Sequence, residues 1–289
     1  MEKIKTILTG ATSGIGYQTA LQLLEINHHL ILANRNKEKA IKVKQSLIAK
    51  FPNAEIDLLT LDLASFKSIE DFIKELKNNY SKIDILINNA GVLSRKEQYT
   101  EEGFEVTLGV NYIGTYYLTE LILEVYNYNM PKKIIFVSSI GCYFGNIKIR
   151  PNFFYKRRGT FRNYFDSKLA NLVYVKELSE KLSNKSIEVK AADPGVVFSQ
   201  IWKWKTSFGK SFIKIQKKLM KTPAEGVKPI LKIINDDLYK NNDYILFTYK
   251  KGRKLPKKIQ SKNVRINFTK YTEKTIQEVT NSLWFLEFF

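Results

Sequence analysis

The sequence predicts an α/β protein: one doubly wound parallel sheet of about seven strands with helices on both faces. Through the first two-thirds of the 289 residues, apolar runs of strand length alternate with helix-length periodic segments. This alternation is typical of a parallel sheet covered on both sides. No repeat, low-complexity tract or Pro/Gly/Ser linker divides the chain, so we expect a single domain over residues 1–289. Right-handed crossovers then place ligands at the carboxyl ends of the strands.

The expected strands are short, rich in Ile, Leu and Val, and end in Gly, Asn, Asp or Ser. They are KTILTG (5–10), HHLILAN (28–34), AEIDLLTLD (54–62), IDILINNAG (83–91), KKIIFVSS (132–139) and IEVKAADPG (187–195). A later run, DYILFTY at 243–249, is the candidate for a seventh. The expected helices begin near Ile15, Lys37, Phe66, Thr100 and Tyr164.

The composition is that of a soluble globular protein, with 44% hydrophobic and 26% charged residues. The single cysteine, Cys142, excludes an internal disulfide and favours a reducing compartment. The N-terminal MEKIK passes at once into a strand-like run, which leaves no room for a signal peptide. No apolar run approaches the ~18 residues of a membrane-spanning helix. We therefore expect a cytoplasmic protein, at most peripheral to a membrane.

The charge is divided unevenly along the chain. Residues 1–144 hold 16 Lys+Arg and 16 Asp+Glu, whereas residues 145–289 hold 31 and 12, which is the whole net charge of +19. A basic half fits a nucleic acid, an anionic membrane or an acidic ligand, and a lysine-rich habit on solvated surfaces explains it equally well. Because no helix-turn-helix, zinc-ligand or aromatic RNA-binding pattern is present, we do not expect nucleic-acid binding.

The first expected strand ends in TGATSGIG, residues 9–16, directly before a helix. Gly10, Gly14 and Gly16 allow a tight turn, a close backbone approach and close helix packing. Backbone N–H groups and the helix dipole would then bind a pyrophosphate. Many loops carry three glycines, and it is the position between first strand and first helix that favours a dinucleotide site.

The end of the second strand indicates which dinucleotide is preferred. Sites that choose NAD(H) place an acidic residue here to hold the ribose hydroxyls, whereas this chain has Asn34 and Arg35. A cation at this point favours a 2′-phosphate, so we expect NADP(H). The alternative is a solvated arginine at a helix start.

Tyr164 and Lys168 lie four positions apart in NYFDSKLANLVYV, residues 163–175. This spacing puts both side chains on one helical face. Taken alone, the pair fits a half-buried tyrosine whose hydroxyl is satisfied by a surface lysine.

Six motifs in order extend the dinucleotide pattern along most of the chain. After the glycine-rich turn come LDL (61–63), NNAG (88–91), VNYIG (110–114), VSSIG (137–141), YFDSK (164–168) and DPGVVFS (193–199). This set resembles the short-chain dehydrogenase/reductase family from residue 4 to about 235, and most closely its retinol dehydrogenase branch. The resemblance implies a Rossmann fold, with a cofactor half over about 1–144 and a substrate half over about 145–289.

The resemblance implies a catalytic quartet of Asn111, Ser139, Tyr164 and Lys168. Alignment to the family's pattern places Ser139, and not Ser138, in the catalytic role. Because a strand alternates its faces, only one of the two serines can point into the cleft. The expected cofactor contacts are Gly10, Ser13, Gly14, Ile15, Gly16, Arg35, Asp62, Leu63, Asn89, Tyr164, Lys168, Val197 and Ser199. Ser199 stands where threonine is more usual and keeps the hydroxyl.

These groups suit interconversion of a carbonyl and its alcohol. Tyr164 would donate the proton to the developing alkoxide, and the Lys168 ammonium would lower its pKa from about 10. Ser139 would polarise the substrate oxygen, and Asn111 would hold a water that links Lys168 to solvent. The structural alternatives are a helix kink at Asn111, a strand end at Ser139 and an incidental Tyr–Lys pair. A non-catalytic NADP(H)-binding sensor or scaffold is the alternative function.

The substrate side is basic and aromatic. Residues 145–162 and a lid segment at about 200–222 combine Phe and Trp with Lys and Arg, which suits an apolar aldehyde or ketone. The same mixture fits weak association with an anionic membrane surface. The resemblance implies a homodimer or a tetramer. No spacing typical of metal ligands occurs, and no histidine partner for Cys142 is evident.

Overall fold

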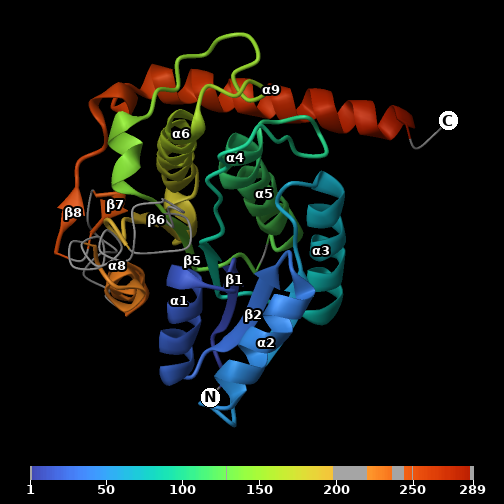
Figure 1. Ribbon diagram of the computed structural model, residues 1–289, viewed down its shortest axis with the longest axis vertical. Helices are drawn as coiled ribbons and strands as arrows, with labels where there is room; N and C mark the ends of the chain where they lie inside the picture. The colour runs from blue at the N-terminus through green and yellow to red at the C-terminus, as the bar shows by residue number, and fades with distance from the viewer. Residues whose placement is uncertain (1, 128, 198–219, 236–243, 249, 287–289) are drawn as a thin grey trace, which may run out of the picture.

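The structure is a computed structural model that describes residues 2–127, 129–197, 220–235, 244–248 and 250–286 (Figure 1). These residues form an eight-stranded sheet in the order β3-β2-β1-β4-β5-β6-β7-β8. Neighbouring strands are parallel except for β7 and β8. The strands are β1 (Lys5–Thr9), β2 (His29–Asn34), β3 (Ile56–Thr60), β4 (Ile85–Asn88), β5 (Lys133–Val137), β6 (Glu188–Ala192), β7 (Leu246–Phe247) and β8 (Gly252–Arg253).

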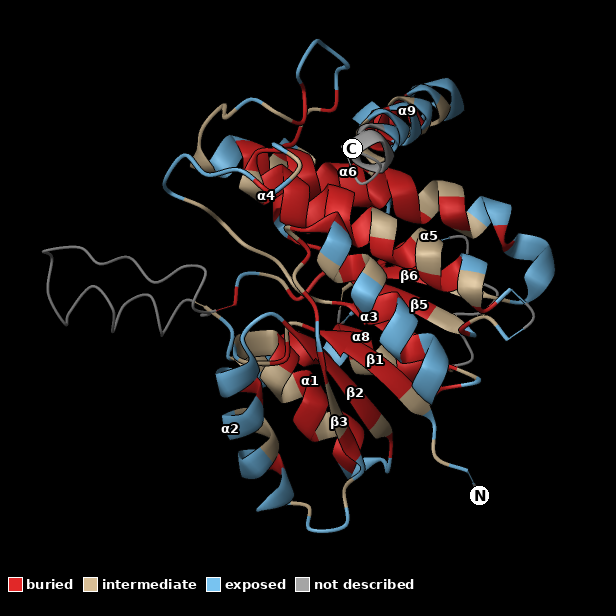
Figure 2. Ribbon diagram, turned by 90° about the vertical axis from the view of Figure 1, so that its right-hand side faces the viewer, coloured by how far each residue is buried: buried red, intermediate tan, exposed pale blue. Residues whose placement is uncertain are grey.

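Helices cover both faces of the sheet, because successive strand residues point to opposite sides. Ile7 of β1 belongs to one apolar core and Leu8 to the other. Helices α1 (Gly14–Glu25), α2 (Lys37–Ile48) and α8 (Pro223–Asn235) pack on one face. The other face carries α3 (Phe66–Asn79), α5 (Thr115–Val125) and α6 (Thr160–Lys181), and α9 (Lys262–Leu286) lies across its outer side (Figures 1 and 2). The predicted doubly wound fold is confirmed.

Two features at the edge of the sheet extend the prediction. The seventh strand lies within DYILFTY as expected, although only Leu246 and Phe247 pair with β6. The antiparallel β8 was not predicted, since the two residues that form it carry no apolar alternation. The sheet is therefore mostly, and not wholly, parallel.

Two expected helix starts are wrong by several residues. The helix expected near Thr100 begins at Val106, where α4 (Val106–Leu108) leads into a π-helical segment, η1 (Gly109–Gly114), and then into α5. Thr100 instead closes a turn in which its N–H donates to the Phe104 carbonyl at 2.8 Å, with Gly103 at φ +83°. The helix expected at Tyr164 begins at Thr160, so Tyr164 lies in its second turn.

The connection from β3 to β4 crosses the sheet, because β4 pairs with β1 on the side opposite β2. The connections on the two sides of β1 therefore diverge and leave a crevice at the carboxyl ends of β1 and β4, which is where open α/β sheets bind ligands. At the other end of β2, His28 is buried in a packing role, and its Nδ1 lies 2.9 Å from Thr6 Oγ1. Among the described residues, none of the helices combines the length and apolar character needed to span a bilayer.

Candidate active site

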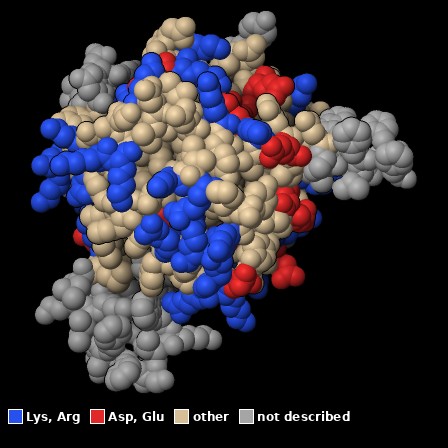
Figure 3. Space-filling view, turned by 90° about the horizontal axis from the view of Figure 1, so that it is seen from above, with Lys and Arg blue, Asp and Glu red and all other residues tan. Residues whose placement is uncertain are grey.

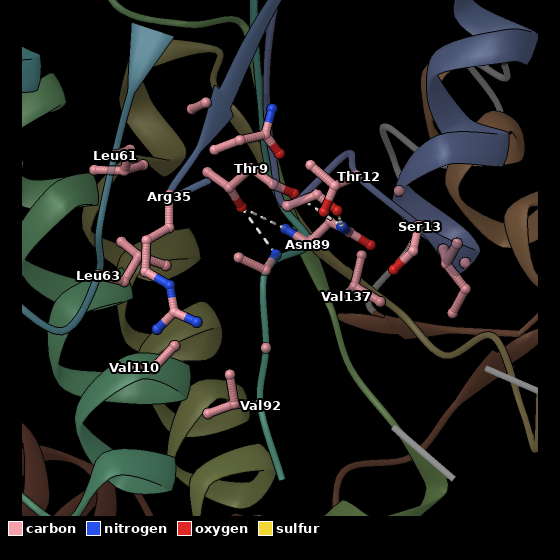
Figure 4. A pocket seen from close by; sticks show the side chains of 18 of the residues that line it. Thr9, Thr12, Ser13, Arg35, Leu61, Leu63, Asn89, Val92, Val110 and Val137 are labelled. Atoms are coloured by element: carbon pink, nitrogen blue, oxygen red, sulfur yellow. Dashed lines mark hydrogen bonds between the residues drawn. The ribbon is translucent and has the colours of Figure 1, made fainter. Parts of the chain in front are cut away.

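A cleft runs along the carboxyl ends of the strands on both sides of this crossover (Figure 4). Its lining includes most of the residues expected from the sequence. Of the expected set, the cleft is lined by Gly10, Ser13, Gly14, Ile15, Gly16, Arg35, Asp62, Leu63, Asn89, Ser139, Tyr164, Lys168 and Val197. Asn111 lies just behind this lining, and Ser199 falls outside the described residues, as does most of the expected lid over 200–222.

The glycine-rich turn is packed too tightly for side chains at two positions. Gly10 has φ +69°, and a Cβ built on it would lie 2.8 Å from Ala90 Cα. A Cβ on Gly16 would lie 2.2 Å from the Gly10 carbonyl oxygen, with no flexible group to give way. The close approach brings the start of α1 against the loop after β4, so the helix N-terminus faces the cleft.

The start of α1 is left open for an anion. Ser13 is the N-cap residue, and its side chain makes no capping hydrogen bond. The first N–H groups of a helix have no partner within the helix, and the dipole favours negative charge there. The backbone therefore fits a dinucleotide pyrophosphate at Ser13, Gly14 and Ile15.

Asn89 braces the turn from the neighbouring strand. Its Nδ2 donates to the Thr9 carbonyl at 2.8 Å and to the Gly10 carbonyl at 3.0 Å (Figure 4). Thr9 returns the support, because its Oγ1 accepts from the N–H groups of Asn89 and Ala90. The Asn89 amide thus stabilises the glycine-rich turn, and its contact with the ribose stays a prediction.

The far end of the cleft carries two cations. The Arg35 side chain is 65% exposed, its Nε lies 3.9 Å from Asp62 Oδ2, and in Figure 4 it extends from the end of β2 beside Leu63. Lys39, in the first turn of α2, lines the same end. Lys39 was not predicted from the sequence, and it lies near Arg35 because α2 begins at Lys37, directly after the end of β2.

A buried polar atom also fits a ligand at this end. The Asn34 Oδ1 accepts from the Ala11 N–H at 2.8 Å, which fixes the side chain at the floor of the cleft. Its Nδ2 is buried and has no partner among the described residues. A donor in this position needs an acceptor, and an adenosine ribose or phosphate oxygen supplies one.

The opposite end brings the expected reactive groups together. Ser139, Tyr164 and Lys168 are 8%, 5% and 6% exposed and come from the end of β5 and from α6. The Ser139 hydroxyl is hydrogen-bonded to Tyr164, whereas the buried Ser138 hydroxyl lies beside the Cys142 thiol. The structure thus sets Ser139, and not Ser138, against the tyrosine.

Lys168 lies beneath the tyrosine. Its Nζ donates to the Val137 carbonyl at 2.8 Å and lies 5.8 Å from the centroid of the Tyr164 ring. Burial lowers the pKa of Lys168 to about 8, and the negative charge of Asp193 opposes this shift. The ammonium is therefore the main form at pH 7, and its proton is held far less tightly than on a solvated lysine.

The expected lowering of the Tyr164 pKa is not present in the structure. Burial raises the pKa of Tyr164, and the Ser139 hydrogen bond only partly opposes it. The attraction of Lys168 favours the phenolate, but removal of the phenol from water disfavours it. In a site this closed, desolvation outweighs a cation that is hydrogen-bonded to a carbonyl.

Asn111 lies in the π-helical segment η1, not in a regular helix turn. Its Oδ1 accepts from the Val92 N–H at 2.7 Å, and its Nδ2 donates to the Val92 carbonyl at 2.9 Å and to Ser167 Oγ at 3.1 Å. Its own carbonyl accepts from Asn171 Nδ2 at 2.7 Å. The residue therefore ties the loop after β4 to α6, and the relay water stays a prediction.

The side chains of Asn111 and Lys168 come close together beside Gly91. A Cβ built on Gly91 would lie 3.4 Å from Asn111 Oδ1 and 3.8 Å from Lys168 Nζ. No group of three or more His, Cys, Asp or Glu side chains that could hold a metal occurs in the described part of the chain. The hydroxyls of Ser139 and Tyr164 and the amine of Lys168 are groups that can transfer a proton to or from an oxygen atom.

Fold and cleft define an α/β protein that holds a dinucleotide with a tyrosine–lysine pair at one end. A sequence model of the short chain dehydrogenase family matches residues 5–208, so the chain belongs to this family. The expected family resemblance is confirmed, and the cleft is a site for NAD(P)(H).

The relatives include retinol dehydrogenases, which confirms the predicted branch. Retinol dehydrogenase 13 of Homo sapiens is 37% identical over 207 residues, 71% of this chain and 62% of that protein. Retinol dehydrogenase 11 of Mus musculus is 34% identical over 233 residues, 78% of this chain and 71% of that protein. A short chain dehydrogenase from Shigella flexneri, complexed with NADP, has a TM-score of 0.68 at 20% identity and covers 87% of this chain and 98% of that one. The match to retinol dehydrogenase 13 thus spans less than two thirds of that protein.

Proposed function

We propose that the protein is an NADP(H)-dependent oxidoreductase that interconverts an apolar aldehyde or ketone and its alcohol. The observation that carries the proposal is the convergence of Ser139, Tyr164 and Lys168 at one end of a dinucleotide cleft. A binding module needs the glycine-rich end of this cleft, but it has no need of a buried phenol hydrogen-bonded to a serine above a buried ammonium.

The roles follow from the positions of these side chains. The nicotinamide supplies or accepts the hydride, so the protein has only to move one proton. Tyr164 gives its proton to the oxygen that becomes the alcohol, and Ser139 donates a hydrogen bond to the same oxygen. Lys168 stabilises the phenolate left behind and returns a proton to it through the groups around Asn111. The reverse direction uses the same atoms in the opposite order.

The upward shift of the Tyr164 pKa suits the reducing direction. A phenol that keeps its proton in the resting site is ready to donate it when an alkoxide develops nearby. Oxidation of an alcohol needs the phenolate, and the positive charge of an oxidised nicotinamide would favour that form. The two directions therefore place opposite demands on one group.

Two cations favour NADP(H) over NAD(H). Arg35 and Lys39 lie at the end of the cleft that follows β2, where no carboxylate follows directly on the strand. A 2′-phosphate there would gain charge-assisted hydrogen bonds, and the 3.9 Å Arg35–Asp62 pair is exposed enough to yield. The NADP complex of the Shigella flexneri relative is consistent with this choice.

A panel of straight-chain and cyclic aldehydes, ketones and alcohols, followed by NADPH absorbance, tests the proposal. We expect turnover with apolar aldehydes and none with charged ones. Tight NADPH binding without turnover of any compound would favour the non-catalytic sensor or scaffold instead.

Association with an anionic membrane surface is a separate proposal about the partner. On the face that carries α9 and residues 145–159, Lys and Arg cover a large area and Asp and Glu gather at one side (Figure 3). Lys148, Arg150, Lys156 and Arg162 are exposed there, beside the exposed Phe144 and Phe161. Cosedimentation with vesicles containing phosphatidylserine tests it, and a lack of salt-sensitive binding would reject it.

A further inference from the structure

The catalytic helix carries a fully buried carboxylate that the proposed reaction does not use. Asp166 lies on α6 between Tyr164 and Lys168 and is 0% exposed. Its Oδ1 accepts from the Asn146 N–H at 2.6 Å, and its Oδ2 lies 2.9 Å from Arg158 Nη1. Arg162 Nε, one turn earlier on α6, lies 3.5 Å from the same oxygen, and its side chain is 45% exposed.

The partners of Asp166 belong to the two ends of one excursion of the chain. Residues 145–159, here called the substrate-side loop, leave the sheet after Ser139 and return at the start of α6. Asn146 is the second residue of this loop and Arg158 the last but one. The Asp166 carboxylate therefore contacts both ends of the loop, and this pair of contacts is here called the clasp.

Other contacts direct the returning end of the loop onto Asp166. The Arg158 N–H donates to Asn163 Oδ1 at 3.1 Å, and its guanidinium carbon lies 4.2 Å from the centroid of the Phe153 ring. The side chain of Phe153 is itself buried in the core beneath α9. Arg158 is thus held by packing on one side and by Asp166 on the other.

The departing end of the loop packs directly on the catalytic helix. A Cβ on Gly145 would lie 2.4 Å from the Phe165 carbonyl oxygen, so only a glycine permits this approach. A Cβ on Gly141 would lie 2.7 Å from Phe165 Cδ1 and 3.4 Å from Ser139 Oγ, so those two atoms are within about 6 Å of one another. Ser139 begins the short 3₁₀ turn η2 (Ile140–Phe144) that leads into Gly145. Fixing Asn146 on Asp166 therefore fixes the segment that carries Ser139.

Stability alone does not account for this arrangement. Burial raises the pKa of the Asp166 carboxyl and lowers that of the Arg158 guanidinium, so each group loses much of its hydration. A buried ion pair recovers this cost only in part, and apolar residues of similar volume often serve the fold as well or better. What the pair adds is a fixed position for the loop, because one carboxylate contacts both of the loop's ends.

We propose that Asp166 is a positioning residue that clasps the substrate-side loop to the catalytic helix and thereby fixes the Ser139 hydroxyl against Tyr164. The clasp acts on the segment that leads from Ser139 through η2 into the loop. It rests on the proposed function for its effect on turnover, but not for its effect on the loop.

Asp166→Asn is the direct test, with Glu177→Gln as the matched control. The asparagine keeps an acceptor for the Asn146 N–H and removes the charge that faces Arg158. Glu177, also on α6, pairs with the buried Arg265 of α9 at 2.6 Å, on a contact that does not involve the loop. Both variants remove one carboxylate of α6 that pairs with an arginine outside that helix, and Arg265 keeps Glu180 at 3.1 Å as a second partner.

With decanal and NADPH as substrates, we expect Asp166→Asn to lower kcat about tenfold and to raise the KM for decanal, since misplacement by a fraction of an ångström is costly in catalysis. The KM for NADPH should stay within about twofold. Glu177→Gln should leave both constants near wild type, after correction for the folded fraction. An equal fall of kcat in both variants would overturn the proposal, because it would mark a general loss of stability.

A second readout does not depend on activity. Trypsin cleaves after exposed basic residues that are not followed by proline, and the substrate-side loop offers Lys148 and Lys156. Under native conditions we expect faster cleavage within this loop for Asp166→Asn than for wild type or Glu177→Gln. If the wild type reduces no aldehyde but this difference appears, the clasp holds and the proposed function fails; equal cleavage in all three overturns the clasp.

The double variant Asp166→Asn with Arg158→Met covers the case in which the single variant does not fold. It removes the unpaired guanidinium, so thermal stability should recover. The low kcat and the fast loop cleavage should persist, because the two loop ends are still unclasped. Recovery of all three properties together would overturn the proposal.

Discussion

Residues 1–144, the expected cofactor half, and residues 145–289, the expected substrate half, contribute to the cleft in different ways. In residues 1–144, positive and negative charges balance, and the cofactor end of the cleft combines glycine turns, strand ends and a helix N-terminus with side chains that directly follow a strand, such as Asn34 and Arg35. In residues 145–289 the charge is +19, and the site depends on side chains held from a distance, such as Asp166 on Arg158. The comparison teaches that backbone sites are fixed by local sequence, whereas the substrate wall is fixed by contacts between remote segments.

The largest expected effect lies where the two halves meet. Tyr164→Phe removes the proton donor without changing the shape of the site, so reduction of decanal should fall by about two to four orders of magnitude. NADPH binding, followed by its fluorescence, should be nearly unchanged. The control is Tyr126→Phe, which removes an equally buried hydroxyl that donates to the Leu76 and Tyr80 carbonyls far from the cleft. Retention of more than about a tenth of the activity by Tyr164→Phe would reject its assigned role.

Substitution of one glycine in each half tests the division between them, because both substitutions cause a similar steric clash. Gly16→Ala would place a methyl 2.2 Å from the Gly10 carbonyl oxygen, and Gly145→Ala would place one 2.4 Å from the Phe165 carbonyl oxygen. Each should destabilise the fold by about 2–3 kcal/mol, measured by urea unfolding. Gly16→Ala should abolish NADPH binding, whereas Gly145→Ala should keep it and raise the KM for decanal. If both variants lost NADPH binding alike, the division between the halves would be artificial.

The cofactor half should also determine which dinucleotide is used. Arg35→Ala should raise the KM for NADPH about tenfold and leave that for NADH nearly constant, because only NADPH offers a phosphate to the lost cation. Lys39→Ala should act in the same direction more weakly, and Lys42→Ala on the exposed face of α2 should have no effect. Added salt should reduce the difference between Arg35→Ala and wild type. Equal use of the two dinucleotides by the wild type would contradict the assignment.

The same contrast explains what could be predicted from the sequence. The first strand is followed directly by the glycine-rich stretch that holds Gly10 and Gly16. Because this stretch is continuous in the sequence, the roles of the two glycines could be predicted without knowledge of the fold. Lys39 was missed because its place in the cleft depends on where α2 begins relative to β2. The upward shift of the Tyr164 pKa was missed because burial is a property of everything packed around the ring.

The substrate half shows the limit more sharply. The 25 positions between Ser139 and Tyr164 announce an excursion of the chain, but they do not reveal that Asp166 holds both its ends. Asp166 is one of several charged residues in α6, some of them exposed, and its position relative to the apolar residues of the helix does not predict that it is buried. Likewise, Asn111 reads as a helix residue, and only the fold shows the π-helical turn that brings it to Val92.

The smallest expected effect on stability concerns the free-energy cost of burying the Lys168 ammonium. Burial lowers the pKa of Lys168 from 10.5 to about 8, which corresponds to roughly 3 kcal/mol of destabilisation at pH 7. Lys168→Met removes this cost and also loses the hydrogen bond to the Val137 carbonyl, so a net gain of about 1–2 kcal/mol should remain. Activity should be lost at the same time, since the phenolate of Tyr164 would have no cation beneath it.

The pH dependence of that gain identifies its cause. Below pH 8 the folded and the unfolded lysine are both charged, and the whole desolvation cost is present. Between pH 8 and 10.5 the folded lysine is neutral while the unfolded one still binds a proton, so the cost falls as pH rises and vanishes above 10.5. The stability advantage of Lys168→Met, measured by urea unfolding at pH 7, 9 and 10, should therefore shrink steadily. An advantage that is constant with pH would mean that better packing of the methionine, and not the buried charge, is responsible.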